Sequence, residues 1–215
     1  MLKSNRLTII ACSIVLISSC LQLLYSDTPI SRTLQRRTLN KFRETAESDY
    51  ALLRNLLTDE KWQEADKKTK ESMGALQEIA TKTYYINNEI QDFSCSHLKT
   101  IDSLWVEYSG GQFGLSVQNS IYLETGNNYE QWNYEAYKRF TDRIGWRREG
   151  QWLSFEDIKY DISAPAGHLP LGGSQIYVEQ DKNTVGSRFI YPQYDSLPGK
   201  PSYQNCLYAA VSEQN

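Results

Sequence analysis

The sequence contains few of the residues from which metal sites and nucleophilic active sites are built. Its 215 residues include two histidines, His97 and His168, and four cysteines. These residues are too scattered to show the spacing of a zinc or haem ligand set. The sequence also has no glycine-rich phosphate loop, nucleophile elbow or zinc-protease motif. The composition therefore gives no support to a metalloenzyme, a nucleotide-binding enzyme or a hydrolase.

One pair of residues resembles a catalytic dyad, because Cys95 precedes His97 by two positions. Side chains two apart at the start of a helix seldom face each other, and no third group is placed to orient the histidine. The carboxylates of the chain are of the kind that soluble helices carry routinely. We therefore expect a protein that is not an enzyme.

The chain also lacks an excess of positive charge. It has 23 basic and 26 acidic residues, a formal net charge of −3, and 40% hydrophobic residues. A mildly acidic domain does not present the basic surface on which nucleic-acid binding depends. Nucleic acids are therefore excluded as partners.

The first 26 residues are typical of an export signal or a membrane anchor. A basic start precedes an apolar run over residues 7–19, and Ile17-Ser18-Ser19-Cys20 is similar to a bacterial lipobox. That similarity implies cleavage before Cys20 and lipidation of its thiol. An apolar run extended to Leu24 would instead be an uncleaved anchor, and a plain cleaved signal is a third possibility. We expect a membrane-anchored protein, either an exported lipoprotein or one on an inner or thylakoid membrane facing the cytoplasm.

Residues 27–47 are predicted to be a linker, helical in part. Their basic residues either contact anionic lipid headgroups or lie on a solvated surface, and composition favours the solvated surface. These residues are Arg32, Arg36, Arg37, Lys41 and Arg43.

Residues 48–170 are predicted to form a compact all-α domain of several short helices, because apolar residues recur at helical spacing and no alternating pattern is long enough to build a sheet. We expect a loop over residues 83–91 and a tight turn at Gly145–Gly150. The predicted helices span residues 49–57, residues 58 to about 76, a segment from Ser96 or Thr100 to Tyr108, residues 115–122 and residues 134–144, with a further short helix after Ser154.

Residues 171–215 form a tail rich in glycine, proline and tyrosine. We expect an irregular tail that packs on the domain through its tyrosines, with short strands possible at residues 175–179 and 188–191. Cys95 and Cys206 could pair in an oxidising compartment, but nothing in the sequence brings them together, so two unpaired thiols are favoured.

The chemistry of the domain favours binding over catalysis. A flat amphipathic ligand needs a broad apolar platform with cations at its rim, and aromatic rings and arginines supply these. Most of the aromatic residues are expected in the core, with Trp105 the clearest case, whereas Trp146 lies in a predicted loop where exposure is expected. The candidates are Trp105, Phe113, Tyr122, Trp132, Trp146, Trp152 and Phe155, beside Arg139, Arg143, Arg147 and Arg148.

Ordered motifs in residues 49–170 carry a family resemblance. The first is Asp49-Tyr50 with Trp62 and Ala65-Asp66, followed by Ile101-Asp102, Leu104-Trp105, Phe113-Gly114, Ser116-Val117-Gln118, Gly145-Trp146-Arg147 and Gly167-His168-Leu169-Pro170. With these motifs the chain is identified as a member of the Genomes-Uncoupled-Four family, the porphyrin-binding regulators of magnesium chelatase.

The resemblance implies an all-helical domain with a concave face that binds protoporphyrin IX or magnesium protoporphyrin IX, and the large subunit of magnesium chelatase as a possible partner. Ligand contacts are expected from Trp146, Arg147 and Arg148, with the tryptophan stacking on the macrocycle and an arginine pairing with a propionate. Phe113, Val117 and Tyr122 are further candidates.

His168 is a candidate axial metal ligand, although a histidine hydrogen-bonded inside the turn at residues 165–170 is favoured. The leader and the tail depart from what a chelatase regulator needs, since magnesium chelatase works inside the cell. We therefore keep two hypotheses: a non-catalytic protein that carries, senses or regulates tetrapyrroles, and a membrane-surface interaction module that reuses the fold without porphyrin.

Overall fold

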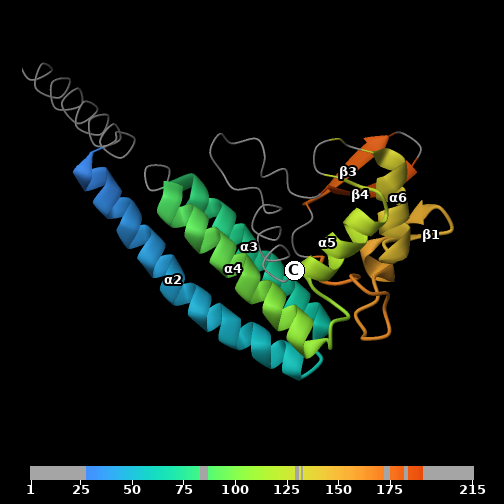
Figure 1. Ribbon diagram of the computed structural model, residues 1–215, viewed down its shortest axis with the longest axis horizontal. Coiled ribbons are helices and arrows are strands. Elements are labelled where there is room, and N and C mark those ends of the chain that lie inside the picture. The colour runs from blue at the N-terminus through green and yellow to red at the C-terminus, as the bar shows by residue number, and fades with distance from the viewer. Residues whose placement is uncertain are drawn as a thin grey trace, which may run out of the picture.

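The protein is mostly helical in the part of the chain that the structure describes, which confirms the predicted fold class. The computed structural model describes residues 28–82, 87–128, 131, 133–171, 175–181 and 184–190. Figure 1 shows how these elements are arranged. The helices are α2 (Pro29–Thr58), α3 (Trp62–Lys82), α4 (Asn87–Tyr108), α5 (Leu115–Glu124) and α6 (Tyr134–Arg143).

Helix α2 corrects the linker prediction for residues 27–47. The Thr28 hydroxyl caps it by accepting a hydrogen bond from the Ser31 backbone N–H at 3.1 Å. Leu39 and Ala46, both from the expected linker, are buried. Together with the buried residues further along α2, they form one continuous buried stripe on the helix. The segment is therefore the first half of a packed 30-residue helix and not a tether.

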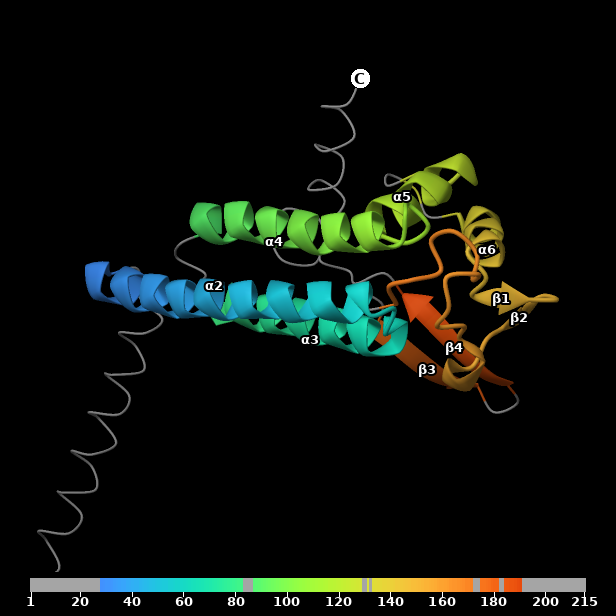
Figure 2. The same ribbon diagram turned by 90° about the horizontal axis from the view of Figure 1, so that it is seen from below.

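Helices α2, α3 and α4 lie side by side as an elongated bundle (Figures 1 and 2). The centroid of the Trp62 ring lies 6.1 Å from that of Trp105 and 5.4 Å from that of Phe113. The Trp105 indole Nε1 donates to the Thr69 hydroxyl at 2.9 Å, so its one polar atom is satisfied in the core. Trp105 is a core residue, as the sequence indicated.

Helix α4 begins at Asn87, earlier than the predicted start at Ser96 or Thr100. Most of the loop expected at residues 83–91 is therefore helix, and residues 83–86 lie outside the described part. The early turns pack, since the rings of Phe93 on α4 and Phe42 on α2 meet edge to face at 5.5 Å between centroids. Because these turns are rich in polar residues, the apolar spacing that predicts a helix is not visible there in the sequence.

The start of α5 is fixed by a glycine and by a carboxylate from α4. Gly114 has a φ of 140°, and a Cβ there would lie 2.7 Å from Val106 Cγ2 and 2.9 Å from Asp102 Oδ1. Asp102 Oδ1 accepts a hydrogen bond from the Ser116 backbone N–H at 2.9 Å. Glycine thus allows a close approach that lets an α4 side chain cap α5.

Two antiparallel hairpins accompany the helices, and the first lies in the domain at residues 48–170, for which no sheet was expected. β1 (Arg147–Arg148) pairs with β2 (Gln151–Trp152), and β3 (Gln175–Asp181) pairs with β4 (Thr184–Ile190). Strands were expected near residues 175–179 and 188–191, but the tail holds a regular hairpin with seven residues in each strand. The tyrosines beyond Ile190 lie outside the described residues.

The predicted leader, residues 1–26 with Cys20, also lies outside the part of the chain that the structure describes. Among the residues that it does describe, no helix combines the length and apolar character needed to cross a bilayer.

Candidate functional site

The chain that follows α6 packs into the protein interior at Gly145 and Trp146. The Trp146 indole Nε1 donates to the His168 carbonyl oxygen at 2.8 Å, and the tryptophan ring meets Phe140 at 6.2 Å between centroids. Gly145 has a φ of 74°, and a Cβ there would lie 2.8 Å from Pro165 Cγ. A residue without a Cβ is therefore needed for the two segments to pass so closely.

The His168 side chain is a buried structural group. Its Nδ1 lies 2.7 Å from the Ile144 carbonyl oxygen and its Nε2 accepts from the Lys159 backbone N–H at 3.2 Å. Since a carbonyl can only accept, the proton is placed on Nδ1 and the ring is neutral. Burial is the main cause that lowers the pKa of His168. Both nitrogens are occupied, which disfavours the axial-ligand role, and the partners lie outside the predicted turn at residues 165–170.

The segment that ends in Leu171 is hydrogen-bonded to two helices, α5 and α3. The Gln118 side-chain amide on α5 donates to the Pro170 carbonyl at 2.8 Å, and the Gly114 N–H donates to the Leu169 carbonyl at 3.1 Å. The Leu171 N–H donates to the buried carboxylate of Asp66 on α3. Several of the motif residues that carry the family resemblance therefore have structural roles.

Three of the six predicted ligand contacts lie in the core. Trp146 is 2% exposed, which corrects the exposure expected for it, and Phe113 is fully buried between the bundle tryptophans. Tyr122 is 9% exposed, and its ring meets Phe140 edge to face at 5.4 Å. Trp146 would have to leave the core to stack on a macrocycle. Val117 is only partly buried.

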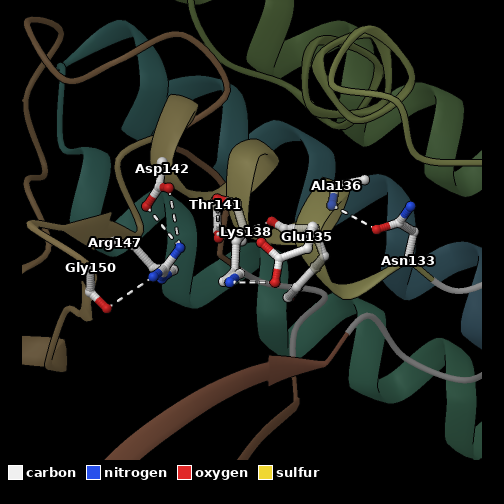
Figure 3. A network of polar contacts seen from close by, with 9 residues as sticks. Asn133, Glu135, Ala136, Lys138, Thr141, Asp142, Arg147 and Gly150 are labelled. Atoms are coloured by element: carbon white, nitrogen blue, oxygen red, sulfur yellow. Dashed lines mark hydrogen bonds and ion pairs between the residues drawn. The ribbon is translucent and has the colours of Figure 1, made fainter.

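Arg147 and Arg148 differ in how far their side chains are held by other residues. Figure 3 shows Arg147 bound by Asp142, 3.1 Å from the guanidinium, and by the Gly150 carbonyl at 2.9 Å. Its guanidinium also lies 5.4 Å from the centroid of the Trp152 ring, so Arg147 braces the hairpin. Arg148 is exposed and forms no ion pair with another described residue.

A groove with a volume of about 450 Å³ lies between α3 and the segment from the 3₁₀ helix η2 (Phe155–Asp157) to Leu171. Its size is within the range of small-molecule sites, and its walls combine an apolar side with a charged side. Phe155 is 50% exposed there, unusual for so large an apolar ring. The lining residues are Gln63, Glu64, Asp66, Lys67, Lys70, Phe155, Tyr160 and Leu171.

Two lysines of this groove offer positive charge to an anionic group of a ligand, and the carboxylates of Glu64 and Asp66 lie beside them. Lys67 and Lys70 are exposed and three residues apart, so they neighbour each other on α3. Lys67 has only a loose partner, Glu71, at 4.0 Å. Burial, with a smaller contribution from the Asp66 carboxylate, raises the pKa of Tyr160 to about 12, so its phenol stays neutral.

Of these groove residues, Phe155 was a candidate ligand contact from the sequence and Asp66 a motif residue, and the other residues carry no sequence signal. Lys67 and Lys70 are part of an ordinary polar helix face, and Tyr160 follows no motif. Nothing local in the sequence indicates that the long segment after η2 folds back against α3, because the tie between Asp66 and Leu171 joins residues far apart in the chain.

A second, more polar depression of about 670 Å³ lies beside α2 and α4 and is lined in part by Arg54, Cys95 and Lys99. Cys95 is disulfide-bonded, which corrects the preference for an unpaired thiol. The partner lies outside the described residues, and pairing with Cys206 stays a prediction. A disulfide-bonded Cys95 offers no thiolate for the Cys95–His97 dyad.

The described residues contain no group of three or more His, Cys, Asp or Glu side chains arranged to hold a metal ion. Trp132, one of the aromatic candidates, lies outside them.

Sequence comparison finds a family match over most of the described chain. Residues 43–184 match the family model described as GUN4-like. A Ycf53-like protein of Synechocystis is 29% identical over 126 residues, which cover 57% of this chain and 51% of that protein. The chloroplastic tetrapyrrole-binding protein of Arabidopsis thaliana is 29% identical over 134 residues, covering 57% of this chain and 48% of that protein. The chain thus spans about half the length of these curated relatives.

Among solved structures, the ligand-free GUN4 of Arabidopsis thaliana is 28% identical, with a TM-score of 0.43. The alignment covers 56% of this chain and 82% of that one.

Proposed function

Because this chain belongs to the GUN4-like family, we propose that it binds a tetrapyrrole and carries, senses or delivers it without catalysing a reaction. The family match over residues 43–184 is the observation that carries the proposal. The name of the Arabidopsis relative, a tetrapyrrole-binding protein, supports it. The relatives do not favour the interaction module without porphyrin that the sequence left open.

The groove between α3 and η2 is the proposed binding site of the tetrapyrrole. A porphyrin such as protoporphyrin IX or its magnesium complex is flat and apolar and carries two propionates on one edge. Phe155, Tyr160 and Leu171 offer an apolar wall for the macrocycle face. Lys67 and Lys70 are placed on the opposite wall to pair with the propionates.

Arg148 is a further proposed contact at the edge of this site. Hydrogen bonds with Ser154 are the main cause that lowers the pKa of the Asp157 carboxylate, and the charge of Arg148 adds a smaller lowering, so the hairpin and η2 are electrostatic neighbours. Of the contacts expected from the sequence, Arg148 is exposed, and Val117 and Arg147 are partly buried. Arg147 supports Arg148 by bracing the hairpin.

The remaining parts of the proposal concern place and partner. A membrane-anchored form facing the cytoplasm could meet the large subunit of magnesium chelatase, whereas an exported lipoprotein could only carry or sense a tetrapyrrole. Binding of the chelatase subunit to the porphyrin-loaded protein would support the cytoplasmic form.

Titration with magnesium deuteroporphyrin, monitored by quenching of tryptophan fluorescence, tests the function. We expect saturable binding at micromolar or lower concentration. The double variant Lys67→Glu and Lys70→Glu should bind about tenfold more weakly, because each reversal replaces an attraction to a propionate by repulsion. Arg54→Glu, an exposed reversal outside the groove, serves as the matched control. Saturable binding unaffected by the double variant would move the site elsewhere, and no saturable binding would refute the function.

A further inference from the structure

The N-terminal half of α2 presents an unusual exposed stripe, which we call the outer face: Ile30, Leu34, Arg37 and Lys41. Their spacing of four, three and four residues places them on one side of a helix. Ile30 is 64% exposed and Leu34 40%, and both cations are exposed. Ile30 and Leu34 thus leave aliphatic surface in water beside two positive charges.

The outer face points away from the bundle. The opposite stripe of the same turns, with Gln35, Leu39 and Ala46, is buried. Figures 1 and 2 show this half of α2 at the end of the bundle away from α5 and α6.

Four of the five cations in this half of α2 divide into two groups. Arg36 pairs with Glu89 at 2.7 Å, and the Arg43 guanidinium lies 5.4 Å from the centroid of the Phe93 ring. Both of these contacts are with α4. Arg37 and Lys41, by contrast, form no ion pair with another described residue. They are therefore available to a partner outside the fold.

The chain before α2 suggests what that partner is. Residues 29–43 contain five basic residues and no acidic one. The apolar run that begins at Leu7 continues to Leu24, and α2 begins five residues later, at Pro29. An apolar segment followed at once by a cationic helix is the pattern of a chain held at a bilayer with anionic headgroups.

We propose that the outer face of α2 lies on an anionic lipid surface. The aliphatic side chains of Ile30 and Leu34 enter the headgroup boundary, and Arg37 and Lys41 extend their charged ends to lipid phosphates. An acidic protein would engage the cations but leaves the two aliphatic residues unexplained. The tetrapyrrole groove does not depend on this contact, so the two proposals fail independently.

The test places the full chain in lipid nanodiscs with nitroxide-labelled headgroups. A fluorescent amino acid replaces Leu34 in one sample and Tyr134, an exposed residue of α6, in the control. Discs contain either phosphatidylcholine alone or phosphatidylcholine with phosphatidylglycerol. We expect strong quenching at position 34 in the anionic discs, weaker quenching in the neutral discs, and little at position 134 in either.

Charge reversal on the same helix then tests the cations. Arg37→Glu or Lys41→Glu should shift the equilibrium between bound and free states of the outer face by at least about fivefold towards the free state. Arg54→Glu, a charge reversal on the same helix about 3.6 turns beyond Lys41, should leave it unaltered. Quenching at position 34 that is absent, that is equal in both lipids, or that is unaffected by both reversals of the outer face would overturn the proposal.

Discussion

Acid should lower the free energy of unfolding through His97, whose side chain is fully buried in the helical bundle. Its Nδ1 meets the Tyr50 hydroxyl, and its Nε2 lies 3.1 Å from the Ser72 hydroxyl. The rings of Phe93 and Phe42 enclose it, each 5.7 Å away between centroids. A neutral imidazole has one donor and one acceptor nitrogen, and two hydroxyls can satisfy both. An imidazolium would add a charge where water cannot reach it.

Burial is the main cause that lowers the pKa of His97 to about 4, against the ordinary 6.5 that it regains on unfolding. Between these values the unfolded chain binds more protons than the folded one, so the stability is complete above pH 6.5 and falls as the pH falls towards 4. Each pH unit in that window costs about 1.4 kcal/mol. The loss is therefore about 2 kcal/mol at pH 5 and about 3 kcal/mol at pH 4.

Denaturant unfolding at pH 7, 6, 5 and 4 measures this loss. The same measurements on the variant His97→Gln serve as the comparison. The variant is expected to be less stable at pH 7, because the substitution disturbs a packed core. The test is how the difference in stability between the two proteins changes with pH, because all other titrating groups are common to both. The difference in unfolding free energy between the two should shrink by about 2 kcal/mol from pH 7 to pH 5. A difference that stays constant across this range would refute the buried neutral histidine.

Three further predictions follow from the same contacts. Trp146→Phe removes the indole that donates to His168, so it should destabilise the fold by about 1–3 kcal/mol in thermal or denaturant unfolding, while porphyrin affinity stays within about twofold. A large loss of affinity with unchanged stability would restore Trp146 as a ligand contact. Gly114→Ala forces a Cβ against Val106 and should lower the melting temperature clearly, whereas Gly74→Ala, where a Cβ meets nothing within 4 Å, should not. Reduction of the Cys95 disulfide should lower the melting temperature, and an unchanged value in reductant would show that the bridge does not support the fold.

The helical class could be predicted because apolar residues in the centres of the helices follow helical spacing. Trp105 shows this well, since its position on the apolar stripe of α4 is enough to place it in the core. Helix ends were less accessible. The first turns of α4 are polar and their packing partner is Phe42 on another helix, so local periodicity could not find them.

The error at Trp146 has a specific cause. Flanking glycine and arginine residues are typical of an exposed loop, but Gly145 serves a close approach to Pro165 and Arg147 bends back to Asp142. Each of these partners is set by the tertiary fold. The groove was missed for a related reason, because its two walls lie about ninety residues apart in the sequence and each appears ordinary alone.

The family match predicts what is bound, and the groove predicts where. Paramagnetic broadening of amide resonances by manganese deuteroporphyrin tests both together, with the diamagnetic zinc complex as reference. We expect broadening concentrated at the groove, around Lys67, Lys70, Phe155 and Tyr160, and saturating at one porphyrin per chain. Broadening centred on another surface, or spread evenly over the protein without saturation, would contradict the account.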